Sequence, residues 1–222
     1  MRLVKAAALF SGGKDSAYSL YKALTQGYEV KYLIHNVFDF PRPSPHTVNI
    51  HVVERIARSI GIQLVKETLD KGREKEQLGA LLQRLNVDVL VAGDLYLEEH
   101  VKWLLEVCEA TGVRLYEPLW VGDSARCEQV LNEEVQCGIK AFICGINTSY
   151  LNLELLGRVI SPELAQTIIT LSRQRGFDAC GERGEYHTLV LEGPMLKRPI
   201  SVLSYRMVKS EGYAYLVVES FK

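Results

Sequence analysis

Apolar residues in the N-terminal half of the chain form short continuous runs separated by longer amphipathic stretches. The runs have the length and composition of buried strands, and they cover residues 4–10, 30–37, 62–68, 87–92 and 113–116. The intervening stretches repeat their apolar residues at helical spacing, which predicts helices from about residue 16, around residues 52–60, and at residues 71–85 and 98–111. Strands that alternate with helices in this way indicate a parallel sheet covered on both faces.

Single residues refine this pattern. Ala17, Leu20, Tyr21 and Leu24 recur at helical spacing and predict one buried face of the first helix. Gly61 follows the second predicted helix and is placed to be its C-cap. A proline-rich segment at residues 39–46 predicts an extended, rigid loop after the second strand.

The pattern changes near residues 121–124. Beyond this point apolar spacing predicts helices at residues 124–137 and 162–175 and strands at residues 139–145 and 186–191. Two further segments, residues 200–208 and 213–219, alternate on either side of a short turn and indicate an antiparallel hairpin.

A chain of 222 residues, 47% of them apolar, can form one large domain or two modest ones. The change of pattern favours two. We therefore expect an α/β protein, in which residues 1–122 form a parallel, doubly wound sheet that binds a nucleotide and residues 123–222 form a smaller α+β domain that binds a substrate.

The charge distribution narrows the classes of partner. The net charge is −1, and basic residues do not form a stripe interleaved with aromatic ones, so we expect no stable nucleic-acid partner. The start of the chain lacks a signal-peptide core, and no apolar run has the length of a membrane span. We expect a cytoplasmic protein without a membrane partner. Its oligomeric state stays open, and a homodimer is one of the alternatives.

Cysteine spacing argues against a structural metal site or a disulfide framework. None of the five cysteines forms a C-x-x-C pair. We interpret them as core residues: Cys108, Cys127, Cys137, Cys144 and Cys180.

The most informative stretch follows the first predicted strand and reads S-G-G-K-D-S at residues 11–16. A strand, a glycine loop and a helix start together favour anion binding, because the first helical turn carries unpaired N–H groups and a partial positive charge. Gly12 and Gly13 allow close approach of a phosphate, Lys14 adds a positive charge, and Ser11 and Ser16 add hydroxyl donors.

A carboxylate at position 15 is unexpected beside a phosphate. Asp15 would repel the ligand unless a divalent cation lay between them, so we expect Asp15 to bind magnesium. The stretch fits neither G-x-x-x-x-G-K-[ST] nor the dinucleotide pattern G-x-G-x-x-G. A simple linking turn is the alternative interpretation, but the whole string in this context favours phosphate binding.

S-G-G-K-D-S after a first strand resembles the pyrophosphate loop of the ATP pyrophosphatases. The resemblance implies an adenine nucleotide α-hydrolase-like fold. It also implies that ATP is cleaved between its α and β phosphates while the substrate is adenylated.

A second unusual stretch, residues 178–188, concentrates glycines, acids, an arginine and a histidine before an apolar strand. Acidic side chains this close repel one another, so they need water, a cation or a cationic substrate. A solvated turn with a salt bridge through Arg183 is the structural alternative.

Together the two stretches are similar to the diphthine–ammonia ligase family of ATP pyrophosphatases, whose C-terminal string is G-E-x-G-E-[YF]-x-T. The resemblance covers nearly the whole chain. Its weaker matches are His46 and Thr47, Gly93 and Asp94, Pro118 to Trp120, and Leu156 to Arg158. His187 departs from the family pattern, since many relatives carry Glu there.

This resemblance implies an activity. ATP and Mg²⁺ would be used to amidate the carboxylate of diphthine, a modified histidine on elongation factor 2, with ammonium as the nitrogen donor. The products would be diphthamide, AMP and pyrophosphate, formed through an acyl-adenylate.

The implied roles divide the site residues into three groups. The implied catalytic residues are Lys14, Asp15, Glu182 and Glu185. ATP would contact Ser11, Gly12, Gly13, Lys14, Asp15, Ser16, Val37, Phe38, Gly93 and Asp94. The other substrates would contact His46, Gly181, Glu182, Gly184, Glu185, Tyr186 and Thr188. Glu182 and Glu185 are candidates for binding ammonium, for taking its proton, or for binding the trimethylammonium group of diphthine.

Several residues keep a second interpretation. Asp94 fits a helix N-cap as well as a ligand, and His46 fits a surface or packing role. We read His35 as a core or edge residue, and His51 and His100 as ordinary helix positions. We expect both Trp103 and Trp120 to serve packing.

Three rival functions stay open. An RNA-thiolating enzyme shares the loop but needs reactive cysteines and a basic surface. A nucleotide sensor would bind ATP without turnover. Another amide-forming ligase would act on a small metabolite.

Overall fold

The computed structural model describes residues 3–38 and 44–222. Most of the predicted proline-rich loop, residues 39–43, lies outside the described residues. In the part of the chain that is described, no helix combines the length and apolar character needed to cross a membrane.

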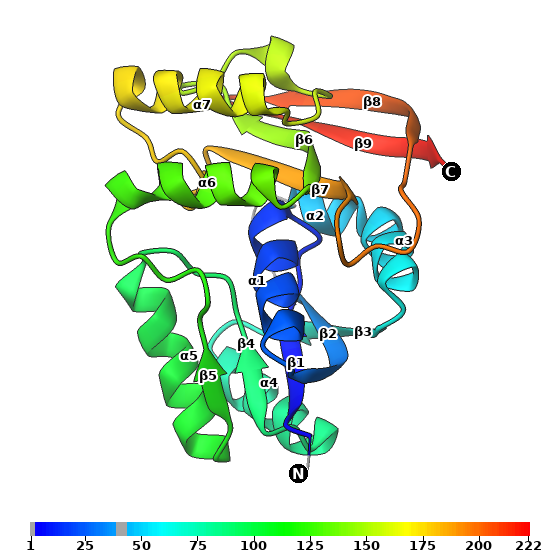
Figure 1. Cartoon of the computed structure of the whole chain (residues 1–222), viewed down its shortest axis with the longest axis vertical. Helices are drawn as coiled ribbons and strands as arrows, with labels where there is room; N and C mark the ends of the chain where they lie inside the picture. Colours follow the sequence, from blue (N-terminus) through cyan, green and yellow to red (C-terminus); the bar gives the residue numbers. More distant parts are fainter. Residues whose placement is uncertain (1–2, 39–43) are drawn as a thin grey trace.

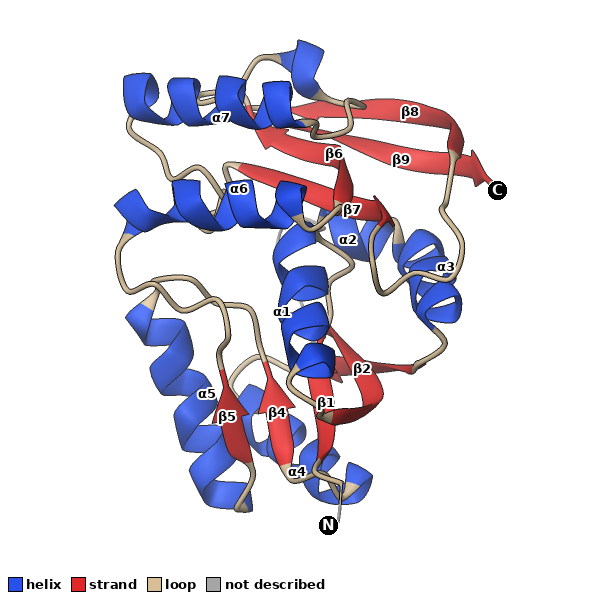
Figure 2. Cartoon of the chain, in the orientation of Figure 1, coloured by secondary structure: helices blue, strands red, loops and turns tan. Residues whose placement is uncertain are grey.

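The N-terminal half forms the predicted parallel sheet, with strand order β3-β2-β1-β4-β5 (Figures 1 and 2). Each neighbouring pair runs parallel. The strands are β1 (Lys5–Leu9), β2 (Glu29–Phe38), β3 (Gln63–Leu69), β4 (Val89–Val91) and β5 (Arg114–Tyr116). The helices are α1 (Lys14–Thr25), the short α2 (Pro45–Val48), α3 (Ile50–Ile60), α4 (Glu74–Leu85) and α5 (Glu98–Thr111).

The central strand shows why the sheet is covered on both faces. Successive side chains of a strand point to opposite faces. Ala6 and Ala8 join the apolar cluster that contains residues of α1 and α3, whereas Ala7 joins the cluster that contains residues of α4 and α5. The structure confirms the doubly wound arrangement.

The C-terminal half contains a second sheet, which is antiparallel and has the order β7-β6-β9-β8. Its elements are α6 (Cys127–Gln136), β6 (Lys140–Asn147), α7 (Pro162–Arg175), β7 (Tyr186–Glu192), β8 (Val202–Ser210) and β9 (Tyr213–Phe221). The predicted hairpin is confirmed as β8 and β9, which pair antiparallel.

Helix α1 stands between the parallel sheet and the C-terminal layer that holds α6 and β7 (Figure 1). One apolar cluster runs from the α1 face of the parallel sheet into β6, α6 and α7. The two halves also meet through the backbone, where the Val190 N–H donates to the Gly12 carbonyl at 2.8 Å. The glycine loop therefore lies at the junction of both halves.

The structure corrects two details of the sequence prediction. The helix expected at residues 124–137 is a short 3-10 turn (Ser124–Arg126) followed by α6. Leu24, assigned to the buried face of α1, is 36% exposed because that face ends at Ala23. Trp120 is 37% exposed, so most of its surface is still covered.

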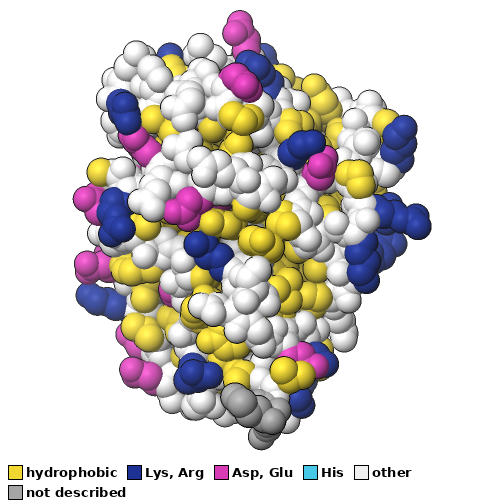
Figure 3. All heavy atoms as spheres, in the orientation of Figure 1, with side chains coloured by type: hydrophobic (Ala, Val, Ile, Leu, Met, Phe, Trp, Pro, Cys, Tyr) yellow, Lys and Arg dark blue, Asp and Glu magenta, His cyan; other side chains and the backbone are white. Residues whose placement is uncertain are grey.

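The surface of the face seen in Figure 3 mixes charges of both signs along its left side, and Lys and Arg side chains gather at its right edge, on the side of α3. Apolar surface on this face is broken into small patches. No single sign of charge covers the whole of this face of the described chain.

Candidate functional site

The loop of residues 11–16 has the geometry that its sequence predicts. Gly12 has a φ of +85°, which a side chain would strain, and Gly13 is the extended N-cap of α1. A Cβ on Gly13 would lie 3.2 Å from both the His46 ring and the Ser11 hydroxyl, so only glycine leaves this space free. Ser16 Oγ lies 3.2 Å from Ser11 Oγ and donates to the Gly13 carbonyl at 3.0 Å, which closes the turn.

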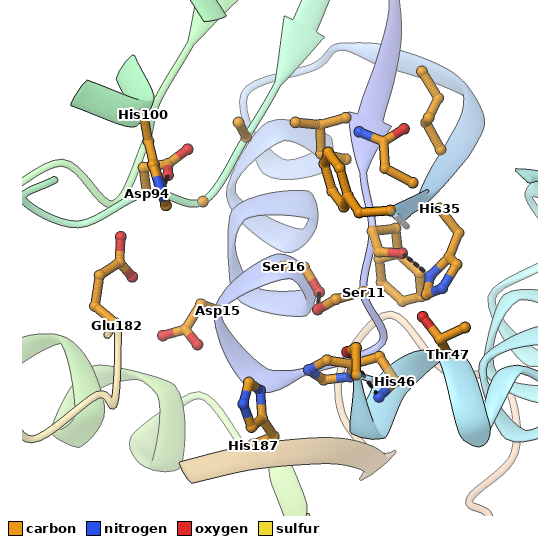
Figure 4. Close-up of a pocket in the computed structure, with 18 residues that line it drawn as sticks. Ser11, Asp15, Ser16, His35, His46, Thr47, Asp94, His100, Glu182 and His187 are labelled. Atoms are coloured by element: carbon orange, nitrogen blue, oxygen red, sulfur yellow. Dashed lines mark hydrogen bonds and ion pairs between the residues drawn. The ribbon is translucent and has the colours of Figure 1, made fainter. Parts of the chain in front are cut away.

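A cavity of about 450 Å³, the large cavity, opens over this loop (Figure 4). It lies at the carboxyl ends of β1, β2 and β4, where the strand order reverses around β1. Parallel α/β sheets bind ligands at this position. The wall includes Ser11, Asp15, Ser16, Asn36, Phe38, His46, Gly93, Asp94, Glu182 and His187.

A smaller cavity of about 150 Å³, the small cavity, lies on the C-terminal side of the loop. The two cavities share part of their walls, namely Ser11, Asp15, His46, Glu182 and His187. Most of the second stretch lines the small cavity, including Gly181, Gly184, Tyr186 and Thr188. The structure thus brings together two stretches that are far apart in the sequence.

One side of the large cavity is acidic. Asp15, Asp94 and Glu182 approach one another there (Figure 4). Glu182 accepts a hydrogen bond from the Leu95 N–H at 3.1 Å, and burial, together with the Asp15 carboxylate, raises the pKa of Glu182 to about 8. Glu182 therefore holds a proton readily near neutral pH unless a cation binds beside it.

Asp94 is not the N-cap of α5, because that position belongs to Leu97. Its carboxylate instead lies 3.2 Å from His100 Nδ1, and its N–H donates to Glu117. The prediction that His100 is an ordinary helix position was wrong, since His100 lines the large cavity and its hydrogen bond to Asp94 raises its pKa. Burial and the Asp94 carboxylate raise the pKa of Glu117 to about 9.

His35 and His46 line the opposite side of the large cavity, and His187 lies between His46 and Asp15 (Figure 4). His35 Nδ1 lies 3.0 Å from the Phe10 carbonyl, and burial lowers the pKa of His35. His46 and His187 meet edge to face with ring centres 5.3 Å apart. Burial lowers the pKa of both rings, that of His187 to about 4, so both are neutral at physiological pH.

Some polar atoms on this side have no partner. His35 Nε2, His46 Nδ1 and Asn36 Oδ1 are buried without a hydrogen bond from any described residue. A ligand with its own donors and acceptors would satisfy them, as burial of unpaired polar atoms costs free energy. The core role predicted for His35 is thus combined with a place on the cavity wall.

The side chain of Lys14 lies on the side of the small cavity. Its side chain is 2% exposed and lines the small cavity, but it does not belong to the described wall of the large one. Its Nζ lies 2.6 Å from Asp15 Oδ1 and 3.3 Å from Glu134 Oε2. Burial alone would lower the pKa of Lys14, but these carboxylates outweigh burial and hold the pKa well above its usual value.

The second stretch is shaped by Asp178, whose role the sequence did not indicate. Its carboxylate accepts the N–H groups of Cys180, Gly181 and Glu182 at 2.9, 2.7 and 3.1 Å. It also accepts the Tyr96 hydroxyl at 2.9 Å. These bonds hold the loop that carries Glu182 against the carboxyl end of β4.

Thr188 connects this stretch directly to the glycine loop. Its Oγ1 accepts the Lys14 N–H, the first of α1, at 3.1 Å. Gly13 has no side chain that could cap the helix, so a residue distant in sequence supplies the acceptor.

Three predicted residues do not line the cavities. Among the described lining residues, neither cavity includes Val37 or Glu185. Glu185 is buried and accepts the Arg183 N–H at 3.0 Å, and burial followed by the Asp178 carboxylate raises its pKa. Gly12 shapes the loop through its backbone but is likewise absent from the described cavity walls.

The donor atoms at the acidic side fit a divalent cation. Ligand atoms of Asp94, His100 and Glu182 lie within 4.8 Å of one another, and Asp15 faces the same space. Magnesium prefers carboxylate and phosphate oxygens. Asp15 and Asp94 are the residues that would hold it, and His100 and Glu182 border the same space.

A parallel sheet with a cavity at its switch point and a glycine loop before α1 defines an α/β protein with the geometry that favours an anionic ligand at the sheet edge. Comparison with known protein families identifies the class of this protein more narrowly than its fold does. Residues 4–115 match the diphthamide synthase N-terminal domain, and residues 126–222 match the diphthamide synthase C-terminal domain. The chain belongs to the diphthamide synthase family.

Curated relatives carry the name diphthine–ammonia ligase. The fission yeast Schizosaccharomyces pombe protein is 25% identical over 98% of this chain, which spans only 39% of that relative. The mouse and human proteins are each 26% identical over 97% of this chain, which spans 89% of each.

Two solved structures resemble the chain at 17% identity. One is a 4-thiouridine synthetase–RNA complex with bound ATP, with a TM-score of 0.42 over 61% of this chain and 41% of that one. The other is the U34-tRNA thiolase NcsA from Methanococcus maripaludis with its [4Fe-4S] cluster, with a TM-score of 0.40 over 82% of this chain and 70% of that one.

Proposed function

We propose that this protein is an ATP-dependent ligase that amidates the carboxylate of diphthine on elongation factor 2, with ammonium as nitrogen donor. One observation carries the proposal: the glycine loop and the acidic C-terminal stretch form the shared wall of the large and small cavities. Family membership and the names of the relatives support the choice of substrate.

The chemistry explains why ATP is needed. A carboxylate is a poor acyl donor because its leaving group would be oxide. Attack of a carboxylate oxygen on the α-phosphorus of ATP forms an acyl-adenylate and expels pyrophosphate. Ammonia then attacks the acyl carbon, AMP leaves with the bonding electron pair, and a proton is released to a base.

In this proposal ATP lies in the large cavity along the carboxyl edge of the parallel sheet. The N–H groups at the start of α1 and the hydroxyls of Ser11 and Ser16 would bind the departing pyrophosphate, because fixed donors stabilise charge that develops during the reaction. Phe38 and Gly93 would border the adenosine. Mg²⁺ held by Asp15 and Asp94 would neutralise phosphate charge.

The second half of the reaction needs a base, since ammonium is mostly protonated at neutral pH. Glu182 is the proposed acceptor for this proton, because it lies on the wall shared by both cavities and its pKa is raised to about 8 by burial. Glu185, behind the loop, would act by holding the backbone of residues 183–185. We further propose that residues 1–122 bind the nucleotide and residues 123–222 the protein substrate.

The test supplies ATP, magnesium, ammonium and diphthine-bearing elongation factor 2, and measures AMP, pyrophosphate and the amide. We expect equal amounts of all three. ADP and orthophosphate in place of AMP and pyrophosphate would refute the reaction type. ATP binding without turnover would indicate a sensor, and AMP formation that depends on tRNA or on a small carboxylic acid would identify one of the rival enzymes.

A further inference from the structure

Glu134 on α6 is a deeply buried acid that the proposed reaction does not use. Its side chain is 1% exposed, and neither carboxylate oxygen takes a hydrogen bond from a described residue. Its Oε2 pairs with Lys14 Nζ at 3.3 Å, and ligand atoms of Glu134, Asp15 and Cys180 lie within 4.8 Å of one another. Burial, together with the Asp15 carboxylate beside it, raises the pKa of Glu134, whereas Lys14 lowers it. A carboxylate buried with so few partners lowers stability, and an apolar side chain of similar size would stabilise the fold more.

The partner of Glu134 is also the partner of Asp15. Lys14 Nζ lies between the two carboxylates, 2.6 Å from Asp15 Oδ1. Asp15 is 28% exposed and faces both cavities, whereas Glu134 does not belong to either described wall. The Lys14 ammonium therefore has one acceptor that can turn toward a ligand and one that is held inside the protein.

Helix packing fixes the inner acceptor. Helix α6 packs on α1, where the Tyr18 hydroxyl donates to the neighbouring Glu133 at 3.1 Å. The Lys14 side chain also lies over the Tyr186 ring, with Nζ 5.6 Å from the ring centre. Lys14 is thus confined on the C-terminal side of the loop.

We infer that Glu134 is a positioning residue: as the second acceptor for Lys14, it allows the Asp15 carboxylate to leave Lys14 and bind a cation that arrives with the nucleotide. Without Glu134, departure of Asp15 would leave a buried ammonium without a counter-charge, which is strongly unfavourable. The inference rests on the proposed nucleotide site, and it assigns to α6 a part in cation binding.

The experiment compares Glu134→Gln with Glu133→Gln, the same change at the adjacent position on the same helix. Isothermal titration measures magnesium binding to each protein saturated with α,β-methylene-ATP. We expect Glu134→Gln to weaken magnesium binding about tenfold, and Glu133→Gln to leave it unchanged. Equal magnesium affinity in both variants and wild type would overturn the inference.

Urea unfolding of the ligand-free protein gives a second readout. A double-mutant cycle with Lys14→Met and Glu134→Gln should show that the two changes are not additive, because the residues interact directly. Additive effects would refute the contact.

Failure of a variant to fold, and failure of the protein to bind the ATP analogue, also test the inference. If Glu134→Gln does not fold, Glu134→Asp replaces it in the titration. We expect this variant to lose less magnesium affinity than Glu134→Gln would. Magnesium affinity equal to that of wild type would overturn the positioning role of Glu134. Failure of wild type to bind the ATP analogue would overturn the proposed function and the inference together. Normal binding of the analogue with unaltered magnesium affinity in Glu134→Gln would overturn the inference alone.

Discussion

The hydrogen bond between Thr188 and α1 permits a quantitative test of how the C-terminal stretch supports the glycine loop. Thr188→Val keeps the shape of the side chain but removes the acceptor of the Lys14 N–H. Because Thr188 is buried, that N–H is left without a partner or with a poorly placed water. An unsatisfied buried donor costs about 1–3 kcal/mol.

Urea unfolding followed by circular dichroism measures this loss. With a slope of about 3 kcal/mol per M, the expected change lowers the midpoint by about 0.3–1 M at unchanged slope. Thr170→Val is the matched control, since Thr170 is exposed on α7 and its hydroxyl donates only to a carbonyl of the same helix. We expect the control to stay within about 0.5 kcal/mol of wild type. Equal stability of the two variants would refute the capping role of Thr188.

Three further predictions test the site. Lys14→Ala and Asp15→Ala should each reduce AMP formation to background while circular dichroism shows a folded protein, and turnover in both variants would refute the loop assignment. Glu185→Ala should leave binding of the ATP analogue intact but block amide formation, because the loop that carries Glu182 loses its support; unchanged turnover would remove Glu185 from the site. Glu182→Gln should alter the pH dependence of stability. The pKa of Glu182 in the folded protein, about 8, lies above its ordinary value of 4.5, so the folded state binds more protons between these values and stability falls as pH rises through this window. The variant lacks this group, so its stability relative to wild type should rise from pH 5 to pH 8 in urea unfolding, and a constant difference would show that Glu182 titrates normally.

Local sequence was sufficient to predict many of the residues that form the site. The glycine loop is a contiguous string, and its conformation depends on Gly12 and Gly13 themselves. Asp94 and Phe38 follow buried strands, and parallel strands bring their carboxyl ends to one edge. Such residues can be predicted because their position follows from the strand that precedes them.

For other residues of the site, the neighbouring sequence did not indicate a functional role. Glu134 occupies an ordinary position in an amphipathic helix, and Asp178 and Glu117 stand in loops that resemble solvated turns. His100 is exposed on the first turns of α5, where histidine is unremarkable. Each takes on its role only through a partner more than five residues away. Glu134 pairs with Lys14, Asp178 with Tyr96, and both Glu117 and His100 with Asp94.

The amino-acid sequence alone determined the order of strands and helices, the parallel sheet and the presence of a phosphate-type loop, because these depend on apolar periodicity and on backbone conformations that glycine permits. Only the tertiary structure decided the direction of the Lys14 side chain. Local sequence points this lysine toward a phosphate, but packing of α6 and β7 on α1 surrounds it with Asp15, Glu134 and Tyr186. The position of a buried charge is set by the counter-charges around it, and here one of these comes from the other half of the chain.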